Sequence, residues 1–209
     1  MEPAQVLIPP YWERAKAELA SRDEILARII ETHPGASLRR TGDPFMTLAR
    51  AIVGQQISVK AADSVWSKLV TRLGEISPQA VLACPDLKAC GLSGKKVEYL
   101  SDLARGFSCG RLAVGDWPEM NDEALIATLT SVRGIGRWTA EMFLIFQIQR
   151  PDVLPLDDLG LQKAIRLHYR GGEAVARREL LEIAAPWRPW RSVATWYLWR
   201  SLDPVPVEY

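Results

Sequence analysis

Apolar residues recur along this chain at the three- and four-residue spacing that places them on one face of a helix. The clearest stretch follows the capping types Asn121 and Asp122, where Leu125, Leu129 and Val132 keep that spacing. One short β-prone run, 6–8, is closed by two prolines. The pattern predicts an all-α protein of about ten helices. Ten longer helices are expected over residues 11–19, 23–31, 45–53, 58–73, 93–106, 121–132, 137–149, 158–169, 173–185 and 190–202, with two shorter ones over 78–83 and 86–89.

The helices 121–132 and 137–149 are joined by the turn Arg133-Gly134-Ile135-Gly136. Glycine takes positive φ without steric penalty, so two glycines one residue apart allow a tight turn and a close approach to a partner. Ile135 between them is expected to pack into a core. The N–H groups that begin the second helix have no acceptor inside it, and the helix dipole adds positive potential there. The turn therefore predicts an anion site that fits a phosphate.

Composition indicates a globular protein, because 48% of the 209 residues are hydrophobic, enough for one domain or two small ones. No apolar run approaches the roughly 20 residues that cross a bilayer, and residues 1–5 lack the basic start of a secretory signal. We therefore expect a cytoplasmic protein with no membrane partner. The net charge of +1 gives no overall argument for nucleic acid, although arginines gather around the turn and in the C-terminal part.

Metal-ligating side chains show no clear pattern. Cys84, Cys90 and Cys109 are odd in number and lack Cys-x-x-Cys spacing, so we expect buried free thiols. His33 and His168 have no partner at metal-ligand spacing. The sequence therefore predicts no metal centre built from these residues.

Four motifs occur in one order along the chain. They are Ala-Ile-Val-Gly-Gln-Gln-Ile-Ser-Val at 51–59, the turn within 129–140, Leu-Pro-Leu-Asp-Asp at 154–158 and Trp-Arg-Pro-Trp-Arg-Ser at 187–192. Asp158 follows Gly136 by 22 residues. Together the motifs resemble the helix-hairpin-helix (HhH-GPD) base-excision DNA glycosylase superfamily, and within it the 3-methyladenine DNA glycosylase II type. The resemblance spans about 43–199.

The resemblance implies two helical lobes with a cleft between them. A helical barrel containing the helix-hairpin-helix is expected from residues 44–152, and the second lobe from 1–43 plus 153–209. Some relatives carry a four-cysteine iron–sulfur cluster near the C-terminus. Because no cysteine follows Cys109, we expect no iron–sulfur cluster. We also expect no other cofactor, apart from the candidate cation described below.

Asp157 and Asp158 are the only two adjacent aspartates in the sequence, they lie where a loop leads into a helix, and either can cap that helix. The resemblance matches Asp158 to the family's catalytic aspartate, which would stabilise positive charge on the sugar or orient the attacking water. Relatives that also cut the strand have a lysine nucleophile where this chain has Trp138. We therefore expect a monofunctional enzyme that leaves an abasic site.

Trp138 and Trp199 are the expected walls of the base pocket, because an indole stacks well on electron-poor alkylated purines. Trp199 matches the family's base-stacking tryptophan. Core packing is the alternative for each tryptophan of the cluster 187–199. Met142 replaces a tyrosine found in some relatives, which leaves the lesion range open.

The remaining expected contacts are to DNA. Gln55 and Gln56 are either solvated loop residues or the DNA wedge that fills the gap left by a flipped base, and Gln56 matches the family's intercalating position. Backbone contacts are expected around Gly134, Gly136 and Thr139, with Arg191 from the basic C-terminal part. The family also implies a candidate site for a monovalent cation on the carbonyls of Arg133 to Gly136.

The sequence thus predicts a monomeric DNA glycosylase of base excision repair, acting on 3-methyladenine and 7-methylguanine in double-stranded DNA. In a bacterium it would associate with the nucleoid. Two alternatives stay open: a non-catalytic helix-hairpin-helix DNA-binding module, and a glycosylase for uracil, hypoxanthine or ethenoadenine. A DNA-binding module has no use for the acid at Asp158, so that residue separates the first alternative from an enzyme.

Overall fold

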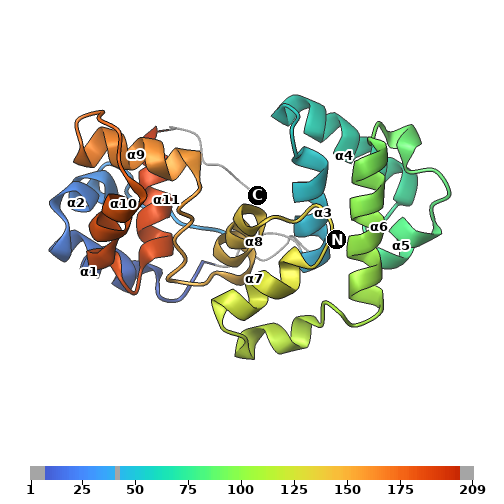
Figure 1. The fold of residues 1–209 in the computed structure, drawn as a ribbon, viewed down its shortest axis with the longest axis horizontal. Helices are drawn as coiled ribbons and strands as arrows, with labels where there is room; N and C mark the ends of the chain where they lie inside the picture. The colour runs from blue at the N-terminus through green and yellow to red at the C-terminus, as the bar shows by residue number, and fades with distance from the viewer. Residues whose placement is uncertain (1–7, 41–42, 203–209) are drawn as a thin grey trace. The chain divides into compact units, whose positions relative to one another are not determined.

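The computed structural model describes residues 8–40 and 43–202, and its fold is all-α, as the apolar pattern predicted. Two compact units share the chain (Figure 1): 42–143, here called the hairpin unit, and 1–41 with 144–209, here called the carboxylate unit. The sequence-based division was 44–152 against the rest. Residues 144–152 therefore fall with the carboxylate unit instead of the barrel.

The hairpin unit is built around α6, which packs against both α3 and α5. Its α-helices are α3 (Pro44–Gly54), α4 (Val59–Leu73), α5 (Pro78–Ala83), α6 (Gly94–Ser108), α7 (Asp122–Thr130) and α8 (Arg137–Phe143). Two 3₁₀ helices, η1 (Lys88–Cys90) and η2 (Val114–Glu119), lie between them.

Local capping explains where several of these helices begin. The side chain of Asp43 accepts a hydrogen bond from the N–H of Met46 before the first-turn proline of α3, and Asn121 accepts from Ala124 at the start of α7. Ser58 caps α4 in the same way. These caps confirm the predicted helix starts. The starts were predictable because each cap joins residues that are close in sequence.

The segment between α6 and α7, expected to be a plain loop, contains η2. Trp117 of η2 is 2% exposed and meets Phe107 and Phe143 edge to face, at centroid distances of 6.1 and 5.5 Å. This aromatic contact orders a stretch whose glycines and proline predicted no helix.

The carboxylate unit combines the two ends of the described chain: in Figure 1 the blue helices α1 (Trp12–Arg22) and α2 (Glu24–Glu31) pack beside the red α11 (Arg191–Leu202). The other elements are the π-helix η3 (Leu144–Ile148), α9 (Leu159–Tyr169), α10 (Arg177–Ala184) and the 3₁₀ helix η4 (Ala185–Trp187). Trp12, Trp187 and Tyr197 are among the largest fully buried side chains of this unit.

Asp23 links the two chain ends in this core. Its Oδ1 caps α2, while its Oδ2 accepts hydrogen bonds from the Tyr169 hydroxyl at 2.7 Å and from Trp187 Nε1 at 3.0 Å. Burial, followed by the bond to Asp23, raises the pKa of Tyr169 above its usual range. The partly buried carboxylate is thereby given four donors.

Several sequence expectations differ from the structure. The helix expected over 137–149 changes from α to π winding at Leu144, and the one expected from 173 begins only at Arg177. Cys90 is buried, but Cys84 is half-buried and Cys109 is exposed, so the expectation of three buried thiols was wrong, although all three are free. Residues 6 and 7 of the β-prone run lie outside the described residues. No helix in the described ranges is both long and apolar enough to span a bilayer.

Candidate functional site

The turn of the hairpin unit is shaped by a glycine that no other residue can replace without strain. Gly134 has φ +84°, and a Cβ there would lie 2.2 Å from Cδ2 of the Tyr99 ring on α6. Ile135 is 4% exposed, which confirms that it packs into the core. The backbone at Gly134 can therefore rest directly on an aromatic ring.

Asp102, one turn after Tyr99 on α6, holds the preceding residue. Its Oδ2 accepts the N–H of Arg133 at 2.9 Å, and its Oδ1 accepts from Arg111 at 3.0 Å. Burial alone would raise the pKa of Asp102, but the two hydrogen bonds and the charges of Arg111 and Arg105 together lower the pKa below the usual value. The charged carboxylate thus fixes the start of the turn.

The two glutamines predicted as a wedge have different environments. Gln55 donates from Nε2 to the carbonyl of Gly134 at 2.8 Å, which ties the loop after α3 to the turn. Gln56 is exposed and adopts φ +58°, a conformation that residues with a Cβ rarely take. Of the two, Gln56 is the residue presented to solvent, and Gln55 has a structural partner.

The end of α3 is also bound by α6. The Lys96 ammonium donates to the carbonyl of Val53 at 2.6 Å, and burial lowers the pKa of this lysine. Lys96, Tyr99 and Asp102 recur every three residues, so they share one face of α6. That face positions both the loop carrying Gln56 and the glycine turn.

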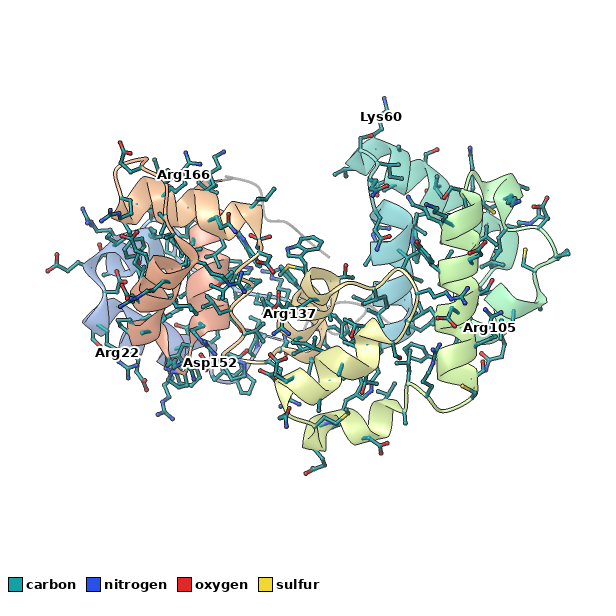
Figure 2. All side chains as sticks on the ribbon, viewed as in Figure 1. Arg22, Lys60, Arg105, Arg137, Asp152 and Arg166 are labelled. Carbon is teal, nitrogen blue, oxygen red and sulfur yellow. The ribbon has the colours of Figure 1, made fainter. Side chains whose placement is uncertain are left out.

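The start of α8 carries the remaining predicted contacts of this unit. Gly136 is exposed and Thr139 is half-buried, and the first N–H groups of a helix have no acceptor inside it. Arg137, labelled in Figure 2, donates both terminal nitrogens to Glu123 and its Nε to buried Glu141. These pairings raise the pKa of Arg137, with Glu123 the larger cause. Backbone amides, rather than this arginine, are thus the anion donors to consider.

The predicted cation site involves neutral oxygens. The Gly134 carbonyl accepts from Gln55, and that of Gly136 accepts from the N–H of Ala140 at 3.0 Å. Each carbonyl has a second lone pair, so both oxygens can still accept a further contact. Across the described ranges, no group of three or more His, Cys, Asp or Glu side chains forms a metal-binding cluster.

The carboxylate unit contains Asp158, which is 8% exposed and caps α9. Its Oδ1 accepts two hydrogen bonds: the Leu161 N–H at 2.6 Å and Nε1 of Trp199 at 2.8 Å. Asp157 instead pairs with Arg177 on the surface, and its side chain is 61% exposed. Of the paired carboxylates, the second is therefore the cap and the buried one.

Trp199 is held from two directions. One face stacks on Phe146 of η3, with centroids 5.7 Å apart and planes 9° apart, and its Nε1 faces Asp158. Gly160, which the sequence did not single out, lies against both residues: a Cβ there would be 3.1 Å from Asp158 Oδ1 and from Trp199 Cδ1. Only its position two residues after the acid could have pointed to it.

Burial separates the predicted pocket tryptophans from those of the core. Of the eight, Trp12, Trp117, Trp187, Trp190 and Trp196 are buried. Trp66 and Trp199 are half-buried, and Trp138 is 40% exposed. Met142 is only 4% exposed. Trp138 thus presents an accessible ring on α8, whereas Met142 packs beneath the surface.

Arg191 has an internal partner. Its Nε donates to Asp152 Oδ1 at 2.7 Å. Its terminal nitrogen Nη2 donates to both Oδ2 and the main-chain carbonyl of Asp152. Its side chain is 16% exposed. Asp152, labelled in Figure 2, lies in the segment that leads from η3 toward Asp158. The guanidinium holds that segment, which is a different role from the predicted DNA contact.

The predicted site residues therefore divide between the units. The hairpin unit contains Gln55, Gln56, Gly134, Gly136, Trp138, Thr139 and Met142. The carboxylate unit contains Asp158, Arg191 and Trp199. Within the first the structure joins Gln55 to Gly134, and within the second it joins Asp158 to Trp199.

Comparison with known proteins adds to this geometry. A family model described as "HhH-GPD superfamily base excision DNA repair protein" matches residues 49–189. A putative DNA-3-methyladenine glycosylase of Bacillus subtilis is 32% identical over 85% of this chain, which spans 66% of that relative's length. DNA-3-methyladenine glycosylase 1 of Schizosaccharomyces pombe is 31% identical, over 90% of this chain and 86% of its own.

Solved structures show the same fold. The crystal structure of a DNA-3-methyladenine glycosidase from Bacillus halodurans matches with a TM-score of 0.83 and 30% identity, covering 94% of this chain and 92% of its own. A 3-methyladenine DNA glycosylase of S. pombe in complex with abasic DNA matches with a TM-score of 0.75 and 30% identity, covering 90% and 96%.

Proposed function

The chain belongs to the HhH-GPD superfamily of base excision DNA repair proteins, and on that premise we propose that it is a DNA glycosylase for alkylated purines. It releases 3-methyladenine and 7-methylguanine from double-stranded DNA after the base has been flipped out of the duplex. The observation that carries the proposal is the Asp158 carboxylate, buried at the start of α9 and held by two donors. The names of the relatives support the substrate class.

Asp158 acts on the sugar. Breaking the N-glycosidic bond places positive charge on the deoxyribose, and a carboxylate in a water-poor site stabilises that charge or orients the attacking water. A DNA-binding module needs the glycine turn but has no use for a buried acid. Asp157, exposed and paired with Arg177, does not meet this requirement.

The enzyme hydrolyses the bond without cutting the strand. Strand cleavage requires an amine that attacks the sugar, and the position after Arg137 holds Trp138 instead of a lysine. Lys163 lies on α9, beyond the acid, and Lys96 donates to a main-chain carbonyl. Borohydride treatment during the reaction is therefore expected to trap no covalent adduct with DNA.

The hairpin unit binds the DNA backbone through the N–H groups around Gly134, Gly136 and Thr139, with a monovalent cation on the turn's carbonyls. Gln56 fills the gap left by the flipped base, because it is the exposed member of the glutamine pair. Within the hairpin unit, the exposed ring of Trp138 is the surface that stacks on the flipped purine.

The test is base release from methylated duplex DNA, measured by chromatography, for wild type, Asp158→Asn and Asp157→Asn. Asparagine caps a helix as well as aspartate does, so D158N should fold and bind abasic-site DNA while losing at least about 100-fold in rate. The matched control D157N removes the neighbouring charge and should keep its rate.

Equal rates for D158N and wild type would remove Asp158 from the mechanism. If wild type frees neither purine, duplexes containing uracil, hypoxanthine or ethenoadenine come next. If these also stay intact while DNA is bound, the chain is a DNA-binding module.

A further inference from the structure

We propose that Trp199 is a positioning residue for Asp158: its indole N–H fixes the carboxylate in the orientation that bond cleavage needs, and Gly160 leaves the room for this contact. This inference rests on the proposed function, since only a carboxylate that does chemistry needs a fixed orientation. It is separate from stacking on a base, which would use the face of the indole instead of its N–H edge.

Two donors from different helices converge on one oxygen. The Leu161 N–H belongs to α9 itself and lies 2.6 Å from Oδ1, while Nε1 of Trp199 comes from α11 at 2.8 Å. The terminal torsion of an aspartate is broad, so a cap bond alone does not fix the plane of the carboxylate. A second donor from another direction restricts that rotation and binds Asp158 to α11.

The indole is itself immobilised. Phe146 covers one face at 5.7 Å with the two planes 9° apart, so the direction of the N–H is set by ring packing as well as by the hydrogen bond. Phe146 belongs to the π-helix η3, and single turns of π-helix occur often at functional sites. The chain thus supports Asp158 through Trp199, and Trp199 through Phe146.

Gly160 is required because a larger residue would crowd Asp158 and Trp199, and not because its backbone needs a positive φ. Its φ is not in the positive range where glycine is needed, yet a Cβ would lie 3.1 Å from both Asp158 Oδ1 and Trp199 Cδ1. Either neighbour would have to move by a few tenths of an ångström, and both belong to the same hydrogen bond. An alanine here is therefore a probe of the bond that leaves the donor and acceptor intact.

The first test compares single-turnover release of 3-methyladenine and 7-methylguanine by wild type, Trp199→Phe and Trp196→Phe. W199F keeps an aromatic ring over Phe146 and loses the donor, so we expect a rate about 10- to 100-fold lower, by the same factor for both bases. Affinity for abasic-site DNA should be unchanged. W196F makes the same change on the same helix, at a ring that packs on Trp12 and Tyr197, and should keep the wild-type rate.

The second test uses Gly160→Ala, with Gly115→Ala as control because a Cβ at Gly115 meets nothing within 4 Å. G160A should lower the rate for both bases by more than any change in Tm explains, since the helix preference of alanine over glycine offsets part of the strain at the new Cβ. G115A should not change the rate. Because G160A retains every side chain of the site, the proposal stays testable even if W199F fails to fold.

The inference is overturned if W199F or G160A, folded, releases both bases at the wild-type rate. It is also overturned if W199F loses activity on one base only and binds DNA more weakly, which is the pattern of a stacking residue. If wild type releases neither base, the proposed function fails and this inference fails with it. If wild type and W199F release both bases at the same rate, this inference fails while the proposed function stands.

Discussion

The glycine turn and the Asp158 site achieve rigidity by opposite means. At the turn the groups proposed to meet DNA belong to the backbone, and side chains from α6 support them: the Tyr99 ring beneath Gly134 and the Asp102 carboxylate on Arg133. At Asp158 the group proposed to act on the sugar is a side chain, supported by one backbone N–H and one indole. Substitutions at the turn should therefore mainly lower the free energy of unfolding, and substitutions at the Asp158 site should mainly lower the rate of base release.

The strongest test of the turn is Gly134→Ala against Gly136→Ala. At Gly134 a Cβ meets the Tyr99 ring at 2.2 Å with φ +84°, so we expect a loss of about 2–4 kcal/mol in the free energy of unfolding. At Gly136 a Cβ meets nothing within 4 Å, so stability should change little. Urea unfolding measures both. Equal losses would show that Tyr99 does not shape the turn.

A smaller effect of opposite signs is expected from the glutamine pair. Gln55→Ala removes the donor to the Gly134 carbonyl and should cost about 1 kcal/mol. Gln56→Gly relieves a residue at φ +58° and should leave stability unchanged or raise it by about 0.5–1 kcal/mol. The measurement is the Tm of the two variants and of wild type, from thermal unfolding in one buffer. Losses in both would contradict the separation of the two residues.

The smallest expected effect is the change, between pH 7 and pH 3, in the stability cost of one substitution. The pKa of Asp102 is lowered in the folded protein, so its ionised form adds stability above the unfolded value of about 3.9, and this is lost as pH falls through the folded pKa. Asp102→Asn should thus cost about 1 kcal/mol at pH 7, and less at pH 3. Urea unfolding of wild type and D102N at both values checks this. A difference that stays constant or grows on acidification would contradict it.

Local signals explain how much was predictable. The caps Asp43, Ser58 and Asn121 and the glycine turn involve residues a few positions apart, so the sequence located them correctly. The η2 helix was missed because its order comes from burial of Trp117 against distant aromatic rings. The change to π winding at Leu144 left no mark in the apolar pattern, since residues 144–147 are all buried and leave no polar face that could reveal the period of the helix.

By itself the sequence determined the all-α class and the helix-hairpin-helix, and it singled out Asp158 as the candidate acid, because each of these depends on residue type at short spacing or on motif order. Only the tertiary structure decided which side chains support these features. Tyr99 reaches Gly134 from α6, and Trp199 reaches Asp158 from α11, across separations along the chain that no periodicity encodes. The tertiary structure also decided that Arg191 pairs with Asp152 and that Gln55 donates to the Gly134 carbonyl, because packing of the folded chain sets the hydrogen-bond partners.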